Sequence, residues 1–203
     1  MTGQTLRKHL GLLALQDPSV SDALDLVGFP KPRTVRGEFE TLVRIVIGQQ
    51  ISTEAAKSIF LKFQSLAPDL KPKSIAKMNT KKLRSAGLSA RKAEYIQNLA
   101  NNVESGELDF DSMRSLPDHE VISVIESQYG FGKWSAEIFL MFALNRKDVF
   151  AADDLALRQS LSRLKKRKVP YSVTEARKAV AHWAPYRTAG SIFLWHYYRG
   201  APQ

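Results

Sequence analysis

Apolar residues recur every three or four positions along most of this chain, and this spacing constrains the fold more than any other feature of the sequence. Phe39, Leu42 and Val46, for example, lie on one face if residues 39–46 form a helix. Alternating runs of β-branched residues and Asn-Gly turns, which would indicate hairpins of strands, are missing. With 44% hydrophobic residues the chain can bury a core. We therefore predict an all-α protein.

Helix-capping residues precede several of the apolar repeats. Ser52 or Thr53 can cap a helix that has Glu54 in its first turn, and Ser172 with Glu175 fits a capping box. We expect an apolar helix over residues 135–144 and a mostly buried one over 186–198. Four further helix starts are expected at the following positions: Thr80, Ser89, Pro117-Asp118 and Asp153-Asp154.

The chain is strongly basic and contains no cysteine. Thirty Lys and Arg against 20 Asp and Glu give a net charge of +10, which favours nucleic acid as a partner ahead of an anionic membrane. The absence of cysteine excludes disulfides, thiolate nucleophiles, zinc–thiolate sites and iron–sulfur clusters. No long apolar run follows the first residues, so we expect no signal peptide, no membrane span and a soluble intracellular protein.

Two stretches carry bases and no acid. Each can be an ordinary solvated face, but the two together with the global surplus favour a nucleic-acid surface. We name them the first and the second basic cluster. The first comprises Lys71, Lys73, Lys77, Lys81, Lys82, Arg84, Arg91 and Lys92. The second comprises Arg158, Arg163, Lys165, Lys166, Arg167 and Lys168.

A Gly-Phe-Gly turn at residues 130–132 separates two apolar helical segments. Glycine allows positive φ and a close approach of backbone, and we expect both at each end of this turn. The amides of Gly132, Lys133 and Trp134 would then face outward at the positive end of the next helix, where they can hold a DNA phosphate. Such a contact positions a duplex but reads no sequence. On its own, the turn favours an ordinary corner between helices over an anion site.

Residues 130–158 resemble the helix-hairpin-helix and Gly-Pro-Asp-loop signature of the base-excision DNA glycosylases, in particular the 3-methyladenine DNA glycosylase II branch. Three further stretches agree in order, and the resemblance spans residues 38–199. They are residues 44–53 (the loop that enters DNA), 87–95 (a helix junction) and 183–195 (the closing helix).

The resemblance implies one glycosylase unit over residues 1–203, folded as two helical lobes around a DNA-binding cleft. Residues 38–147 would form the central lobe, which ends in the helix-hairpin-helix. Residues 1–37 and 148–203 would form the second lobe, which carries the catalytic aspartate loop. The resemblance also implies that a damaged nucleotide is flipped out of the duplex.

Asp154 matches the family's catalytic aspartate by its place after the hairpin. Breaking an N-glycosidic bond develops positive charge on the deoxyribose, and a nearby carboxylate can stabilise that charge and orient a water. Alkylated purines already carry positive charge, so that one carboxylate suffices. The alternative is that Asp153-Asp154 only caps the next helix. We expect both roles, with Asp153 as the cap and Asp154 facing the cleft.

The residue at position 134 predicts the subclass. Related bifunctional glycosylases carry there a lysine that forms a Schiff base and cleaves the strand, whereas this chain has Trp134. Its neighbour Lys133 would be turned away by about 100° on a helix, as a phosphate contact or a solvated base. We therefore predict a monofunctional enzyme that leaves an intact abasic site. Gly130, Gly132, Lys133 and Ser135 are the expected DNA-binding residues of the hairpin.

A flipped, electron-deficient base gains from stacking on an indole. Trp134 and Trp195 match pocket positions of the family, and Ile138 and Gln49 are expected beside them; core packing is the alternative for both tryptophans. The remaining hole in the DNA stack needs a wedge. Gln50 occupies the position where some relatives use leucine, and Ile51 is the apolar alternative; a plain capping turn is also possible.

The remaining expectations concern support, metals and substrates. Arg187 is expected to brace the aspartate loop or to touch DNA. We expect no cofactor and no catalytic metal, although the family's hairpin can hold a monovalent cation through main-chain carbonyls. The expected function is excision of 3-methyladenine and 7-methylguanine types by a monomer, in the cytoplasm with the nucleoid or in a nucleus. Deaminated or etheno bases are the alternative substrates, and a non-catalytic architectural DNA-binding protein is the alternative class.

Overall fold

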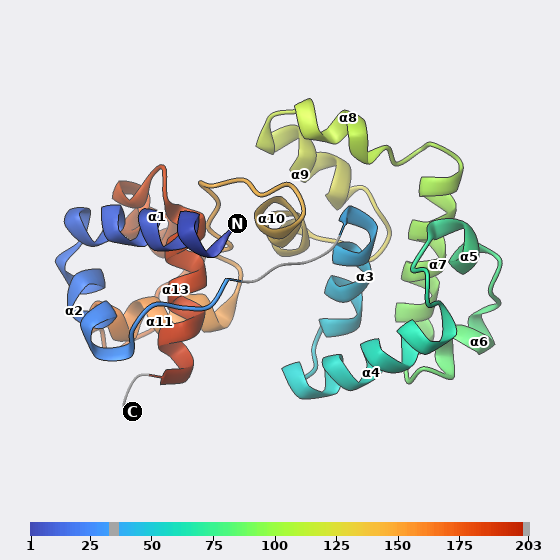
Figure 1. The fold of residues 1–203 in the computed structure, drawn as a ribbon, viewed down its shortest axis with the longest axis horizontal. Coiled ribbons are helices and arrows are strands. Elements are labelled where there is room, and N and C mark those ends of the chain that lie inside the picture. Colours follow the sequence, from blue (N-terminus) through green and yellow to red (C-terminus); the bar gives the residue numbers. More distant parts are fainter. Residues whose placement is uncertain (33–36, 201–203) are drawn as a thin grey trace. The chain divides into compact units, whose positions relative to one another are not determined.

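The computed structural model describes residues 1–32 and 37–200, and within them every regular element is a helix. This confirms the predicted all-α fold class. Figure 1 shows the helices in chain order. The first seven are α1 (Gly3–Gln16), α2 (Pro18–Val27), α3 (Glu38–Gly48), α4 (Thr53–Leu66), α5 (Pro72–Ala76), α6 (Thr80–Arg84) and α7 (Ala90–Glu104). The others are α8 (Phe110–Ser115), α9 (Asp118–Glu126), α10 (Lys133–Phe142), α11 (Leu155–Leu164), α12 (Val173–Ala179), the short 3-10 helix η1 (Ala181–Trp183) and α13 (Arg187–Gly200).

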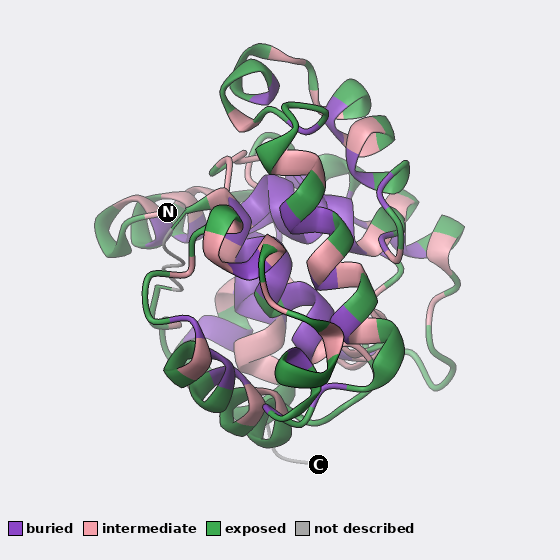
Figure 2. Ribbon diagram, turned by 90° about the vertical axis from the view of Figure 1, so that its right-hand side faces the viewer, coloured by how far each residue is buried: buried purple, intermediate pink, exposed green. Residues whose placement is uncertain are grey.

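The chain divides into two compact units. Unit 1 comprises residues 1–34 and 140–203, and unit 2 comprises residues 35–139. The second division falls within α10, eight residues before the boundary predicted after residue 147, because α10 continues from one unit into the other. In both units buried residues form stripes along the helices, and exposed residues cover the opposite sides (Figure 2). No helix in the described part of the chain is long and apolar enough to cross a membrane.

Unit 1 is built around α13, which packs against α1, α2 and α11. Its central residues are apolar or small, and Gly190 is needed because a Cβ there would lie 2.5 Å from the indole of Trp183. Trp183 is fully buried, and its Nε1 donates a 2.7 Å hydrogen bond to Asp17. The carboxylate of Asp17, only 2% exposed, thereby joins the N-terminal helices to the C-terminal ones.

Asp17 is a buried charge of unit 1 that several side chains hold. Lys165 Nζ donates to both of its carboxylate oxygens at 2.7 and 2.6 Å, and His182 Nε2 lies 3.1 Å from one of them. Burial by itself would raise the pKa of Asp17, but the hydrogen bonds from Lys165, Trp183 and His182 outweigh it and lower this pKa to about 2. Asp17 also caps α2 by accepting from the Ser19 amide.

Unit 2 is organised around α7, which packs against α3, α5 and α6. Ser89 caps α7 through the amide of Lys92. The predicted caps Ser52 and Ser172 are confirmed, the latter with the complete capping box of Glu175. The prediction of Thr80 as a cap is wrong, because Asn79 one residue earlier accepts from the Lys82 amide. Asparagine competes better than threonine for this position.

Candidate functional site

The Gly-Phe-Gly turn joins α9 to α10, as the sequence predicts. The carbonyl of Gly132 accepts the amide of Ala136, so Gly132 stands at the N-terminus of α10. The first amides of any α-helix lack acceptors within that helix, and α10 begins with Lys133. Lys133 and Gly132 are exposed, while Ser135 is buried. The turn therefore has the local structure of an anion-binding helix start.

The two glycines of the turn serve different purposes, which corrects the expectation of positive φ at both. Only Gly130 has positive φ (+90°), and a Cβ there would lie 2.4 Å from the ring of Tyr95. Gly132 has no such φ, and nothing lies within 4 Å of its Cβ position. Gly130 is thus required by the packing of α7, whereas Gly132 leaves open space in front of the helix start.

The predicted wedge loop follows the C-terminus of α3. Gln50 and Ile51 are exposed, Ile51 by 38%, and Gln50 has a left-handed φ of +57°. The side chain of Gln49 turns the other way, and its Nε2 donates to the carbonyl of Gly130 at 3.0 Å. Within unit 2 the structure therefore brings the wedge loop and the hairpin together through one side chain.

Lys92 contacts main-chain carbonyls, which differs from the nucleic-acid surface predicted for the first basic cluster. Its ammonium donates to the carbonyls of Ile47 (2.9 Å) and Gln49 (2.7 Å), at the end of α3. Desolvation by burial lowers the pKa of Lys92. Its place in the first basic cluster is thus corrected: the side chain reaches inward because α3 ends with unpaired carbonyls beside α7.

Asp154 lies at the N-terminus of α11 in unit 1. It is half-buried, and its Oδ1 accepts the amide of Leu157 at 3.0 Å. Asp154 is therefore the N-cap, and the prediction that Asp153 fills this role is wrong. Asp153 instead forms a 3.2 Å ion pair with Arg177. The extended backbone of Asp154 (φ −71°, ψ 116°) puts this residue at the cap position, one step after Asp153.

The loop that leads to Asp154 is tied to α13. Arg187 forms two hydrogen bonds with Asp148, from Nε (2.7 Å) and Nη2 (2.6 Å), and they lower the pKa of Asp148. The Thr188 hydroxyl donates to the carbonyl of Arg146 and accepts the amide of Val149. Arg187 thus braces the aspartate loop, which was one of its two predicted roles.

The geometry of the hairpin and of the aspartate loop can be compared with known proteins. The model of the HhH-GPD superfamily of base excision DNA repair proteins matches residues 43–185. This chain belongs to the HhH-GPD superfamily. The matched range contains the hairpin, the wedge loop and Asp154, so the family predicted from these segments is confirmed.

Individual members of the superfamily are similar over most of this chain. DNA-3-methyladenine glycosylase 1 of Schizosaccharomyces pombe is 33% identical, over 77% of this chain and 71% of that protein. The structure of the S. pombe 3-methyladenine DNA glycosylase in complex with abasic DNA has a TM-score of 0.86 at 30% identity, over 93% of this chain and 95% of that one. An 8-oxoguanine glycosylase/lyase of Clostridium acetobutylicum in complex with DNA shares the fold (TM-score 0.75, 17% identity, 94% and 68% covered). This chain spans between 48% and 79% of the length of the curated relatives that it matches.

The predicted pocket residues are divided between the units of this HhH-GPD protein. In unit 2, Trp134 is half-buried on the first turn of α10, and Ile138 is 8% exposed one turn later. In unit 1, half-buried Trp195 of α13 stacks on Phe142, with ring centroids 6.0 Å apart. Gln49 makes the hairpin contact described above. A shared base pocket stays a prediction.

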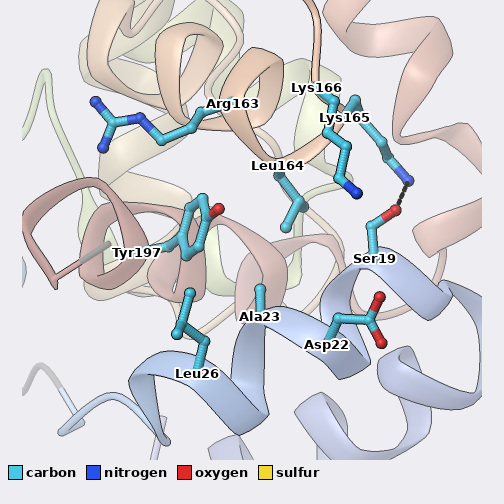
Figure 3. Close-up of a pocket in the computed structure, with 9 residues that line it drawn as sticks. All are labelled: Ser19, Asp22, Ala23, Leu26, Arg163, Leu164, Lys165, Lys166 and Tyr197. Carbon is cyan, nitrogen blue, oxygen red and sulfur yellow. Dashed lines mark hydrogen bonds between the residues drawn. The ribbon is translucent and has the colours of Figure 1, made fainter. Parts of the chain in front are cut away.

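The second basic cluster turns out to be largely engaged within unit 1. Lys165 pairs with Asp17, and Arg167 pairs with Glu175 at 3.1 Å. Lys165 and Lys166 also line a pocket of about 390 Å³ between α2, the end of α11 and α13. In Figure 3 the Lys165 ammonium is turned toward Ser19, whereas the Arg163 guanidinium extends away from Ser19.

Sequence reasoning missed three residues that hold these segments. Asp17 receives its side-chain donors from more than 140 positions away, so no local pattern marks it. Asp148 and Tyr95 stand within predicted segments, but their partners Arg187 and Gly130 belong to other helices or turns, 39 and 35 positions along the chain. Among the described residues no three His, Asp or Glu side chains gather as metal ligands, and a metal-free reaction stays a prediction.

Proposed function

We propose that this HhH-GPD protein is a monofunctional DNA glycosylase. It rotates a damaged nucleotide out of duplex DNA and hydrolyses the N-glycosidic bond of alkylated purines of the 3-methyladenine and 7-methylguanine type. The observation that carries the proposal is the carboxylate of Asp154, held at a helix start within the matched range. The named activity of the S. pombe relative supports the choice of substrate.

Asp154 is suited to hydrolysis without an additional acid. As the C1′–N bond breaks, its electron pair leaves with the cationic base, which becomes neutral, and positive charge appears on the sugar. The carboxylate stabilises that charge and orients a water, whose oxygen bonds to C1′ and whose proton passes to solvent. The products are a free base and an abasic site. No redox group or metal takes part in this balance, and we propose that the enzyme needs none.

The absence of strand cleavage follows from position 134. The resemblance to bifunctional glycosylases places their Schiff-base lysine where this chain has Trp134, and an indole has no nucleophilic amine. Lys133, the first residue of α10, is exposed and points about 100° away around the helix. We assign Lys133 to phosphate contact, together with the amides of the hairpin.

The same proposal includes the partner and its setting. The protein binds duplex DNA as a monomer, wherever the cell keeps its DNA. Hairpin amides and Lys133 contact the backbone, Gln50 or Ile51 fills the vacated stack, and Trp134 and Trp195 stack against the everted base. A monovalent cation on the hairpin carbonyls is a separate proposal, which DNA affinity in Na⁺, K⁺ and Li⁺ at constant ionic strength would test.

A panel of duplexes, each with one defined lesion, tests the proposal. We expect strand breaks at alkylated purines only after hot alkali, since the enzyme leaves an abasic site intact. Breaks without alkali would overturn the monofunctional assignment, and Lys133→Ala would show whether Lys133 is responsible. Release of deaminated or etheno bases alone would assign the alternative substrates. Binding without release from any lesion would identify an architectural protein.

A further inference from the structure

The side chain of Lys92 holds the end of α3 from a neighbouring helix. Its ammonium has three N–H donors, and two of them bind the carbonyls of Ile47 and Gln49 at 2.9 and 2.7 Å. No carboxylate of the described residues pairs with it. The last carbonyls of a helix lack partners within the helix and carry its negative end, so a half-buried cation is well placed there.

The carbonyl of Ile47 precedes the tight turn that presents the wedge, and the carbonyl of Gln49 lies within this turn. Gln49 has φ −58° and ψ 128°, and Gln50 then has φ +57°, as in the middle of a type II turn. A glutamine with positive φ is unfavourable unless the surrounding structure imposes it. The carbonyl of Gln49 belongs to the peptide that enters Gln50, so its bond to Lys92 fixes the orientation of that peptide.

Helix α7, which carries Lys92, also contacts the hairpin. Tyr95, one turn after Lys92 on α7, packs so closely on Gly130 that no side chain fits there. Gly130 in turn accepts the 3.0 Å bond from Gln49 Nε2. Lys92, Gln49 and Tyr95 therefore connect the wedge loop, the hairpin and α7 into one closed set of contacts within unit 2.

We propose that Lys92 is a positioning residue for base flipping: it holds the Gln50–Ile51 turn in the shape that enters the DNA stack, at a fixed distance from the hairpin. This inference rests on the proposed function, because it assigns a role within the same DNA-binding event. It differs from a phosphate contact, since two of the three donors of Lys92 face main-chain carbonyls rather than solvent.

Insertion can be measured without any chemistry. The duplex carries a stable abasic-site analogue with 2-aminopurine opposite, whose fluorescence reports insertion into the stack at saturating protein. We expect Lys92→Met to lower the insertion equilibrium about tenfold, as befits the loss of two charge-assisted hydrogen bonds. Lys92→Arg, which keeps a donor cation, restores most of the signal, and Lys62→Met on the exposed side of α4 leaves it unchanged.

The salt dependence of affinity separates positioning from phosphate contact. Lys92→Met should leave the slope of log K against log salt unchanged, whereas Lys82→Met lowers it by about 1 if Lys82 contacts a phosphate. A slope lowered by Lys92→Met, with insertion intact, would overturn the proposal. Equal loss of insertion in Lys92→Met and Lys92→Arg would overturn it too, because the arginine preserves the charge and the donors.

A double-mutant cycle tests whether Lys92 acts through the wedge. In a Gln50→Ala/Ile51→Ala background, Lys92→Met should have almost no further effect on insertion, since the residues that it positions are gone. A further tenfold loss in that background would contradict the inference. If the wild-type protein inserts but releases no base from any lesion, the glycosylase proposal fails while this one stands. If the wild-type protein releases base and the Lys92→Met variant inserts normally, only the proposal for Lys92 fails.

Discussion

The two basic clusters look alike in sequence but differ in structure. In the first cluster, seven of the eight bases are exposed, and their side chains make no hydrogen bond or ion pair with any described residue; Lys92 is the exception. In the second, Arg158 donates to the Tyr171 carbonyl, Lys165 pairs with Asp17 and Arg167 pairs with Glu175. Among the described residues of this cluster, only Lys166 and Lys168 are exposed with side chains that form no hydrogen bond or ion pair.

The difference shows that a run of bases says little about what those bases do. In the second cluster, Lys165 takes its partner Asp17 from 148 positions away, whereas the partners of Arg158 and Arg167 stand 13 and 8 positions along the chain. Apart from Lys92, the bases of the first cluster in unit 2 are exposed, and none of their side chains forms an ion pair with a described residue. We therefore infer that the first cluster supplies charge for DNA and that the second one mainly stabilises unit 1. Four predictions test this division.

The largest effect should come from Lys165→Met. It removes the main partner of a carboxylate that is 2% exposed, and breaking a buried pair on one side is costly. We expect the free energy of unfolding to fall by about 3 kcal/mol, at the lower end of the usual range because Trp183 and Ser19 still bond Asp17. Denaturant titration measures it, and Lys168→Met is the control without effect. Equal stability of both variants would contradict the inference that the second cluster stabilises unit 1 through Lys165.

The pH dependence of stability should also report the contact between Lys165 and Asp17. The pKa of Asp17 is lowered from its ordinary 3.8 to about 2 in the folded protein, so its contribution is complete above pH 4 and is lost as the pH falls toward 2. That contribution is about 2 kcal/mol. Between pH 5 and 2 the free energy of unfolding should fall less steeply with decreasing pH in Lys165→Met than in the wild type. Parallel curves would show that Lys165 does not set this pKa.

Neutralising the first cluster should affect DNA binding instead of stability. In Lys81→Ala/Lys82→Ala, we expect Kd for duplex DNA to rise about tenfold at 0.1 M salt and the salt slope to fall by 1 to 2. The free energy of unfolding should change by less than about 0.5 kcal/mol, because both side chains are exposed. Fluorescence anisotropy over a salt series gives both binding quantities. An unchanged slope would remove the first cluster from the DNA-binding surface.

The smallest effect is expected for Arg167→Ala. Arg167 contacts Glu175 and the Tyr171 ring at the surface, where an ion pair contributes little. We expect no measurable change in thermal midpoint and, if the second cluster is structural, no change in salt slope. A lowered salt slope would show that part of the second cluster contacts DNA.

The sequence predicts what depends on neighbours along the chain. The caps Ser52, Ser89 and Ser172 are confirmed because a capping side chain bonds amides two or three residues away. Where two candidates stand side by side, as at Asp153 and Asp154, backbone angles decide, and composition does not reveal them. The carbonyl contacts of Lys92 and the donors of Asp17 depend on tertiary packing, so neither could be read from local pattern.

The catalytic role of Asp154 was predicted through resemblance, and the structure provides a way to test it separately from folding. Because Asp154 caps α11, its replacement by asparagine keeps a good cap while removing the negative charge. Asp154→Ala removes both and should also cost about 1 kcal/mol of stability. The pair of variants thus separates chemistry from folding.

The most direct test is single-turnover release of 7-methylguanine from duplex DNA by the wild type and by Asp154→Asn, with thermal midpoint and DNA affinity measured alongside. We predict at least a hundredfold slower release by Asp154→Asn, as expected when a charge that stabilises the transition state is lost, with midpoint and affinity unchanged. Release at the wild-type rate would contradict the assignment of Asp154 as the catalytic carboxylate.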